Sequence, residues 1–146
     1  MPTHALGDRL SRPADAAVGF DSRGYVLAPG DDGPDTVKPA TNADKFIGVN
    51  YRSTLNLTDS DVDLGRPIAV QIDGYGPVLA EADEYEVGDR VYVDDTVEDG
   101  VVSKTGEGAF VGVVLDDNDI SEIEADYDLI QVSYTGNAGG HETGAV

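Results

Sequence analysis

Three aspartates at alternate positions form the most suggestive chemical motif in the chain. Asp59, Asp61 and Asp63 match the first ligand positions of an EF-hand calcium loop, which takes carboxylates from its positions 1, 3 and 5. That loop also needs glycine at its sixth position and glutamate at its twelfth, and these positions hold Leu64 and Val70. The pattern therefore favours a solvated acidic loop, and the three aspartates are weak candidates for a metal site.

The residue types that most enzymes use are scarce or badly placed. The chain has no cysteine, and its two histidines, His4 and His141, lie near opposite ends of the sequence. Neither has a nucleophile or a metal ligand at a useful spacing, so no hydrolytic triad can be assembled. A glycosidase needs a carboxyl pair in a cleft with aromatic walls, and the chain has no tryptophan and three phenylalanines. We therefore expect no enzymatic activity and no cofactor.

Charge excludes another class of function. The chain carries 29 acidic and 9 basic residues, for a net charge of −20. Nucleic-acid binding through the phosphate backbone needs a basic surface, so we expect no nucleic-acid partner. Self-repulsion at this density destabilises a compact state, and molar salt removes most of the penalty by shortening the Debye length to about 3 Å. The excess of aspartate and the three lysines are typical of halophilic proteins; the alternatives are an acidic mesophilic domain and a highly charged linker protein.

Basic residues gather near the N-terminus. Arg9, Arg12 and Arg23 are three of the nine basic residues in the whole chain. We interpret residues 1–15 as an extended arm, and predict that these arginines contact a partner, because arginine binds carboxylates in a bidentate manner. Alternatively, the arginines offset neighbouring aspartates at positions 8, 15 and 21.

No part of the sequence predicts a membrane segment or a secretion signal. No stretch approaches the ~18 consecutive apolar residues of a spanning helix, so we expect no contact with a membrane. The first residues lack the basic and apolar regions of a signal peptide.

The elements that would position these residues are short strands, and one strand motif occurs twice. Residues 46–49 read Phe-Ile-Gly-Val and residues 110–113 read Phe-Val-Gly-Val, each after a strand that begins with glycine. Glycine inside a strand often marks a bulge or a close approach of two backbones, and we expect this of both repeats. Phe46 and Phe110 are expected to be core residues.

The middle of the chain predicts further strands with breaks between them. Ile68, Val70 and Ile72 alternate with other residues, as in a strand with one buried face. Glycine and proline at 74–77 are expected to break this strand, and a new one to begin at 77–82.

The C-terminal half predicts a turn, a possible helical turn and a last strand. Asp99-Gly100 supplies the positive φ that hairpins prefer. Residues 116–126 are compatible with a single helical turn, and 128–134 alternate as a strand.

These elements define the expected architecture. About nine short strands at close spacing predict an all-β fold, a small β-barrel or sandwich. We assign residues 1–15 to an N-terminal arm, 16–135 to the barrel domain and 136–146 to a flexible tail.

The ordered motifs resemble a known family. After a Gly-x-Val strand come Phe-Ile-Gly-Val, a strand ending in Asp-Gly, Pro-Val-Leu-Ala-Glu-Ala, Val-Gly-Asp-Arg-Val-Tyr-Val, Asp-Gly-Val-Val, Phe-Val-Gly-Val-Val-Leu-Asp and a closing Ile-Gln-Val strand. This set, from about Ala16 to Tyr134, resembles the capsid decoration (head-stabilising) proteins of tailed viruses. The acidic insert at 56–66 departs from the family pattern. With the acidic composition, the resemblance indicates a virus of haloarchaea.

The resemblance implies a structural role in the virion. It implies a homotrimer on the outer capsid surface, assembled in the host cytoplasm and seated on three-fold or quasi-three-fold axes. There the protein would bind the major capsid protein and hold capsomers against the pressure of packaged DNA. The alternative is a spike or tail module that recognises a host receptor or glycan, and copy number separates the two.

Overall fold

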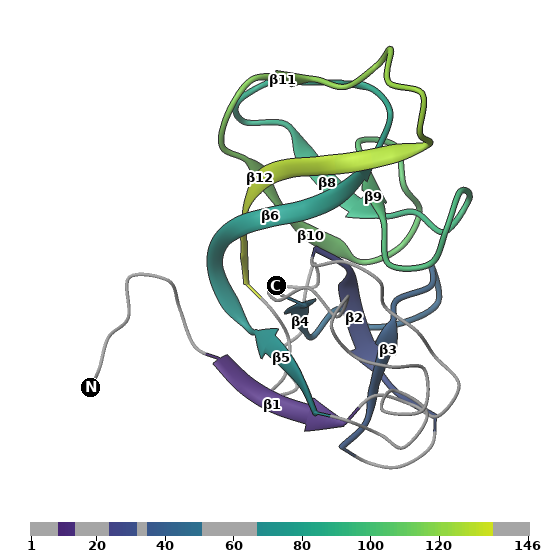
Figure 1. The fold of residues 1–146 in the computed structure, drawn as a ribbon, viewed down its shortest axis with the longest axis vertical. Coiled ribbons are helices and arrows are strands. Elements are labelled where there is room, and N and C mark those ends of the chain that lie inside the picture. Colours follow the sequence, from purple (N-terminus) through teal and green to yellow (C-terminus); the bar gives the residue numbers. More distant parts are fainter. Residues whose placement is uncertain (1–8, 14–23, 32–34, 51–66, 136–146) are drawn as a thin grey trace.

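The computed structural model describes residues 9–13, 24–31, 35–50 and 67–135, and the side chains of all of these except 9–13 and 67–69. Strands and turns make up this part of the chain, and it contains no helix. The strands form one open sheet, one closed barrel and one short ribbon (Figure 1). The expected all-β fold with a small barrel is therefore confirmed.

The open sheet is antiparallel throughout, in the order β1-β5-β4-β2-β3. Its strands are β1 (Arg9–Pro13), β2 (Val26–Pro29), β3 (Val37–Pro39), β4 (Gly48–Asn50) and β5 (Pro67–Gln71). β1 forms one edge of this sheet, so five residues of the predicted N-terminal arm pair with the chain's own β5. The strand that we expected at 16–20 lies outside the described residues.

The barrel closes through five strands in the order β10-β12-β6-β9-β8. They are β6 (Asp73–Glu81), β8 (Arg90–Val93), β9 (Val102–Ser103), β10 (Phe110–Val114) and β12 (Tyr127–Thr135). Two further short strands, β7 (Glu84–Tyr85) and β11 (Asn118–Asp119), form the ribbon at the end of the barrel away from the open sheet (Figure 1).

Strand β6 contradicts one prediction. Residues 74–77 do not break it, because β6 pairs with β12 residue by residue from Asp73 to Glu81. The interruption lies at Ile72, between β5 and β6, where the chain bends from the open sheet into the barrel (Figure 1). Gln71 is buried beside this bend and its Nε2 donates to the carbonyl oxygen of Tyr75, 3.3 Å away. Glycine and proline thus permit strong curvature here without ending the strand.

The helical turn considered for 116–126 is also wrong. Asn118 and Asp119 form β11 and pair with Tyr85 and Glu84 of β7. Asp119 Oδ1 accepts hydrogen bonds from the backbone nitrogen and the hydroxyl of Ser121, at 3.0 and 2.6 Å. Such local side-chain bonds compete with helix formation.

Two hydrophobic clusters join the open sheet to the barrel, and the larger one contains Phe46. Phe46, between β3 and β4, is fully buried among the inward-facing valines of the barrel strands. Its ring meets that of Tyr134 on β12 edge to face, with centroids 6.2 Å apart. A further link is polar: the hydroxyls of Tyr25 and Tyr127 both donate to Glu98 Oε2, at 2.6 and 3.1 Å. The sheet and the barrel therefore support one another.

Phe110 differs from Phe46 and contradicts the expectation that both are core residues. The β8–β10 register shifts between Phe110 and Gly112, as at a β-bulge. Val111 is buried, whereas Phe110 is partly exposed on the outside of the barrel. The phenylalanine of the Phe-x-Gly-Val repeat thus lies in the core in one copy and on the surface in the other.

Both repeat glycines lie where backbones approach closely, as predicted. A Cβ added at Gly48 would lie 2.7 Å from the carbonyl oxygen of Gln71, and one added at Gly112 would overlap the carbonyl oxygen of Ser133. Gly100 has a φ of 86°, which confirms the predicted turn.

Candidate functional site

The structure describes few of the residues that we expected to bind a partner or a metal. Arg9 and Arg12 lie on β1, the edge strand of the open sheet. Arg23 and the three aspartates at 59, 61 and 63 lie outside the described residues. Within the described residues, no group of three or more His, Cys, Asp or Glu side chains could hold a metal ion. Partner contact by the arginines and metal binding by the aspartates stay predictions.

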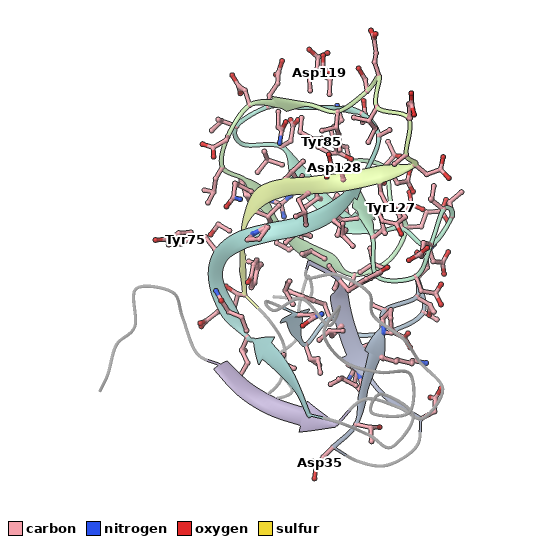
Figure 2. The ribbon with its side chains drawn as sticks, viewed as in Figure 1. Asp35, Tyr75, Tyr85, Asp119, Tyr127 and Asp128 are labelled. Atoms are coloured by element: carbon pink, nitrogen blue, oxygen red, sulfur yellow. The ribbon has the colours of Figure 1, made fainter. Side chains whose placement is uncertain are left out.

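A row of side chains crosses the outside of the barrel on four neighbouring strands. Arg90 on β8 pairs with Val113 on β10, Val113 with Ser133 on β12, and Ser133 with Tyr75 on β6. Directly opposed residues of antiparallel strands project from the same face of a sheet. Tyr75 is 48% exposed and projects away from the bend of β6 (Figure 2).

Neighbouring outward positions extend this row into a face without carboxylates, which ends on β6 at Asp73, the partner of Thr135. Leu115, which follows Val113 by two positions, is 39% exposed, and the pairs Tyr92–Phe110 and Pro77–Gln131 flank the row. We call this surface the acid-free face; its members are Tyr75, Pro77, Arg90, Tyr92, Phe110, Val113, Leu115, Gln131 and Ser133. They include one cation, six apolar or aromatic side chains that are partly or fully exposed, and no acid, in a chain with 29 acidic residues.

Arg90 is held in place by two aromatic rings of this face. Its guanidinium carbon lies 4.4 Å from the centroid of the Phe110 ring. The Phe110 and Tyr92 rings meet at 60° with centroids 5.6 Å apart, and Arg90 Nε donates to the Tyr92 hydroxyl at 3.4 Å. Among the described residues no carboxylate forms an ion pair with Arg90. The cluster therefore presents an ordered cation with free hydrogen-bond donors.

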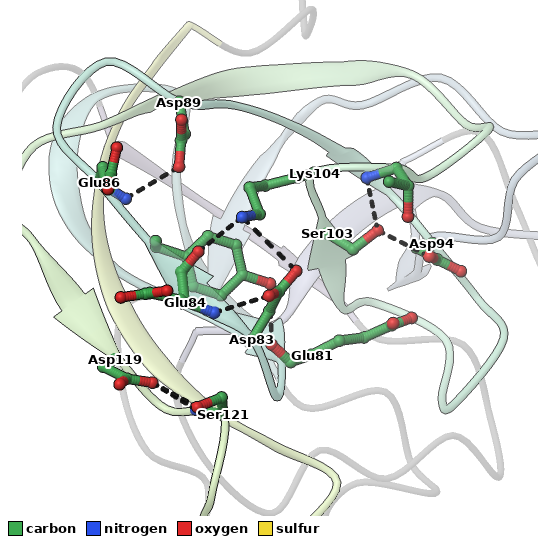
Figure 3. Close-up of polar contacts among 12 residues, drawn as sticks. Glu81, Asp83, Glu84, Glu86, Asp89, Asp94, Ser103, Lys104, Asp119 and Ser121 are labelled. Atoms are coloured by element: carbon green, nitrogen blue, oxygen red, sulfur yellow. Dashed lines mark hydrogen bonds and ion pairs between the residues drawn. The ribbon is translucent and has the colours of Figure 1, made fainter.

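A different polar group lies at the end of the barrel beside the ribbon (Figure 3). Ser103 Oγ donates to Asp94 Oδ2 at 2.7 Å, and the Thr96 backbone nitrogen donates to Asp94 Oδ1 at 3.0 Å. Burial opposes ionisation of Asp94, but these bonds outweigh it and hold the Asp94 pKa below its ordinary value. Burial, and next the nearby Asp94 carboxylate, raise the pKa of Glu81 to about 7. Glu81 Oε2 is buried without a hydrogen-bond partner among the described residues.

The titration of Glu81 makes stability depend on pH. Its folded pKa of about 7 lies above the ordinary value of 4.5, so between these values the folded state binds more protons than the unfolded state. The free energy of unfolding should therefore fall as pH rises through this window. We expect the Glu81→Gln variant to lose this slope in urea titrations between about pH 5 and pH 7 at constant salt. The exposed-acid control Glu107→Gln should keep it, and equal slopes in both variants would refute the assignment.

Lys104, which follows Ser103 in the chain, contacts the residues of the ribbon and not the Asp94 carboxylate. Lys104 Nζ donates to the carbonyl oxygen of Glu84 at 2.6 Å and lies 3.7 Å from the Asp83 carboxylate (Figure 3). It also lies 5.6 Å from the centroid of the Tyr85 ring. Lys104 therefore fastens β7 to the barrel.

The fold and the surface together are those of a structural or binding module: a β scaffold with two hydrophobic clusters inside and an arginine–aromatic cluster outside. In the part of the chain that the structure covers, no helix is long and apolar enough to cross a membrane. Residues 3–135 match the family model described as "Structural cement protein (E217 gp24/Pam3 gp6)". The chain therefore belongs to this family of phage structural cement proteins. No curated protein matches the chain.

Family membership gives the general role. The protein is a structural, capsid-stabilising component of a phage particle, in a family that is structural rather than catalytic. The resemblance to capsid decoration proteins is thereby confirmed at the level of the family.

Proposed function

We propose that this protein decorates the outer surface of an icosahedral capsid and cements contacts between capsomers of the major capsid protein, against the pressure of packaged DNA and in high salt. The observation that carries the proposal is the match to the structural cement family over residues 3–135. This range includes both the open sheet and the barrel.

The architecture is suited to a clamp. Because Phe46 and the barrel valines form one core, a load on the open sheet passes to the barrel through packed side chains. The open sheet carries Arg9 and Arg12 on its edge strand, and the barrel carries the acid-free face. We propose that the N-terminal arginines, including Arg23, pair with carboxylates of a neighbouring shell subunit, and that the protein assembles as a homotrimer.

Copy number tests the proposed function. We expect quantitative mass spectrometry of purified particles to find this protein in numbers comparable to the major capsid protein. Removal of the protein should lower the temperature at which particles release DNA. A few copies per particle would instead assign the protein to vertices or tail, as a module for host recognition.

Salt dependence tests the halophilic part of the proposal. With a net charge of −20, self-repulsion should weaken the folded state at low ionic strength. We expect the thermal unfolding midpoint to rise steeply between ~0.1 M and ~2 M KCl as the charges become screened. A midpoint that does not change with salt would contradict adaptation to high salt, while leaving the cement function untouched.

A further inference from the structure

We infer that the acid-free face is the surface that binds the capsid shell. Arg90, which lies within this face, would form an ion pair with a carboxylate of a shell subunit. The inference rests on the proposed cement function, and it assigns the docking surface within that function. Neither the sequence motifs nor the family match identifies this surface.

The first argument is the distribution of charge. Acids are spread along a chain with a net charge of −20, so most approaches by another acidic protein are repulsive. Four adjacent strands nevertheless carry no carboxylate at the nine positions of the acid-free face. Depletion of acids together with exposed tyrosine and leucine is the composition of an interface core. Tyr75 and Leu115, at 48% and 39% exposure, provide apolar surface that a partner would cover.

The second argument is that the Arg90 side chain is already held in one orientation before a partner binds. Ordering a free arginine at an interface costs side-chain entropy, which weakens binding. Here Phe110 stacks under the guanidinium and Tyr92 accepts its Nε proton, so much of this ordering exists before binding. Arginine is weakly hydrated and forms bidentate bonds with carboxylates. Arginine and tyrosine are also the residues that dominate binding energy at interfaces.

The third argument identifies the occupant. Arg90 forms no ion pair with any acid among the described residues, so its complement is a carboxylate from another molecule. The side chains that neighbour it on β10 and β12 are uncharged, so the partner surface that covers them should be apolar or polar around that single acid. The shell subunit, which the cement function requires as partner, is the occupant that we assign.

Binding to shells that lack the protein tests this assignment. Arg90→Glu should lower the affinity for such shells by at least about 30-fold in co-sedimentation. The substitution replaces the cation with an anion, which would repel the carboxylate of the shell subunit. The control Lys45→Glu makes the same change of charge at another exposed base outside the face, and should bind within about twofold of wild type. Thermal unfolding midpoints, measured at the salt concentration of the binding assay, should show that both variants are folded.

A second variant keeps the test independent of Arg90. Tyr75→Ala removes an exposed ring at the far end of the row and should lower affinity about 10-fold, as loss of an interface tyrosine does. Wild-type affinity in both face variants would overturn the inference and leave the cement function standing. Loss of self-association with unchanged shell binding, seen by analytical ultracentrifugation, would assign the face to a second copy instead. A wild-type protein that does not bind shells would overturn the cement function itself.

Discussion

Replacement of Phe46 by alanine should lower the free energy of unfolding by about 3–5 kcal/mol, the usual cost of emptying a buried phenylalanine site. Phe46 is fully buried and contributes to the core that the open sheet shares with the barrel. Its loss leaves a cavity where the two sheets meet and removes the edge-to-face contact with Tyr134. Urea titration in high salt, followed by tyrosine fluorescence, measures the change.

The second copy of the motif provides a matched control. Phe110→Ala makes the same substitution at the same motif position, but Phe110 is partly exposed and contacts Arg90 and Tyr92 on the outside of the barrel. We expect it to cost roughly 1 kcal/mol of stability, as for a partly exposed ring, and to weaken shell binding. Equal destabilisation by the two substitutions would contradict the different environments of the two repeats.

A methyl group at Gly112 should be nearly as damaging as the loss of Phe46. The Cβ of alanine would overlap the carbonyl oxygen of Ser133 on the paired strand β12, and also contact Val132. A backbone atom cannot move aside as a flexible side chain can, so β10 and β12 must separate. We expect Gly112→Ala to cost about 3 kcal/mol, at the upper end of overpacking effects, and thermal unfolding measures it.

Gly76→Ala is the control for Gly112→Ala. Gly76 lies on β6, which pairs with the other edge of β12. There the nearest atom to an added Cβ is the Tyr134 hydroxyl oxygen, 3.9 Å away, so the methyl group fits. Alanine also reduces the conformational freedom of the unfolded chain, and the variant should match or exceed wild-type stability. A stability loss at Gly76 equal to that at Gly112 would show that close backbone approach is not the cause.

Local sequence patterns predicted the strand content well, because alternation reports directly on a half-buried strand. Ile130, Val132 and Tyr134 are buried in β12, and Val91 and Val93 in β8, as their spacing indicates. The two Phe-x-Gly-Val repeats show the limit of such patterns. A register shift between β8 and β10 decides that Phe110 lies outside, and register depends on a strand far away in sequence.

The break expected at 74–77 failed for a related reason. Glycine and proline weaken a strand locally, but the nine-residue pairing with β12 outweighs this preference. Gly76 and Pro77 oppose Val132 and Gln131 in that ladder. Long-range pairing of this kind cannot be read from one segment alone.

The acid-free face was missed because its residues come from four segments that only the barrel brings together. A signal existed in the sequence: the outward positions of β8 and β10 hold arginine, aromatic and valine residues, whereas acids are the commonest residues at the exposed positions that the structure describes. Arg9, Arg12 and Arg23 were predicted as contact residues because basic residues are concentrated near the N-terminus. Arg90 is the single arginine among the described side chains, and its importance comes from what surrounds it.

Cryo-electron microscopy of purified particles tests the central claim most directly, because it shows whether and how the protein lies on the shell. The account predicts trimers at three-fold and quasi-three-fold positions, with the acid-free face against the shell and the β1 edge of the open sheet beside a neighbouring subunit. Absence of the protein from the shell lattice, or its confinement to vertices or tail, would contradict the cement function.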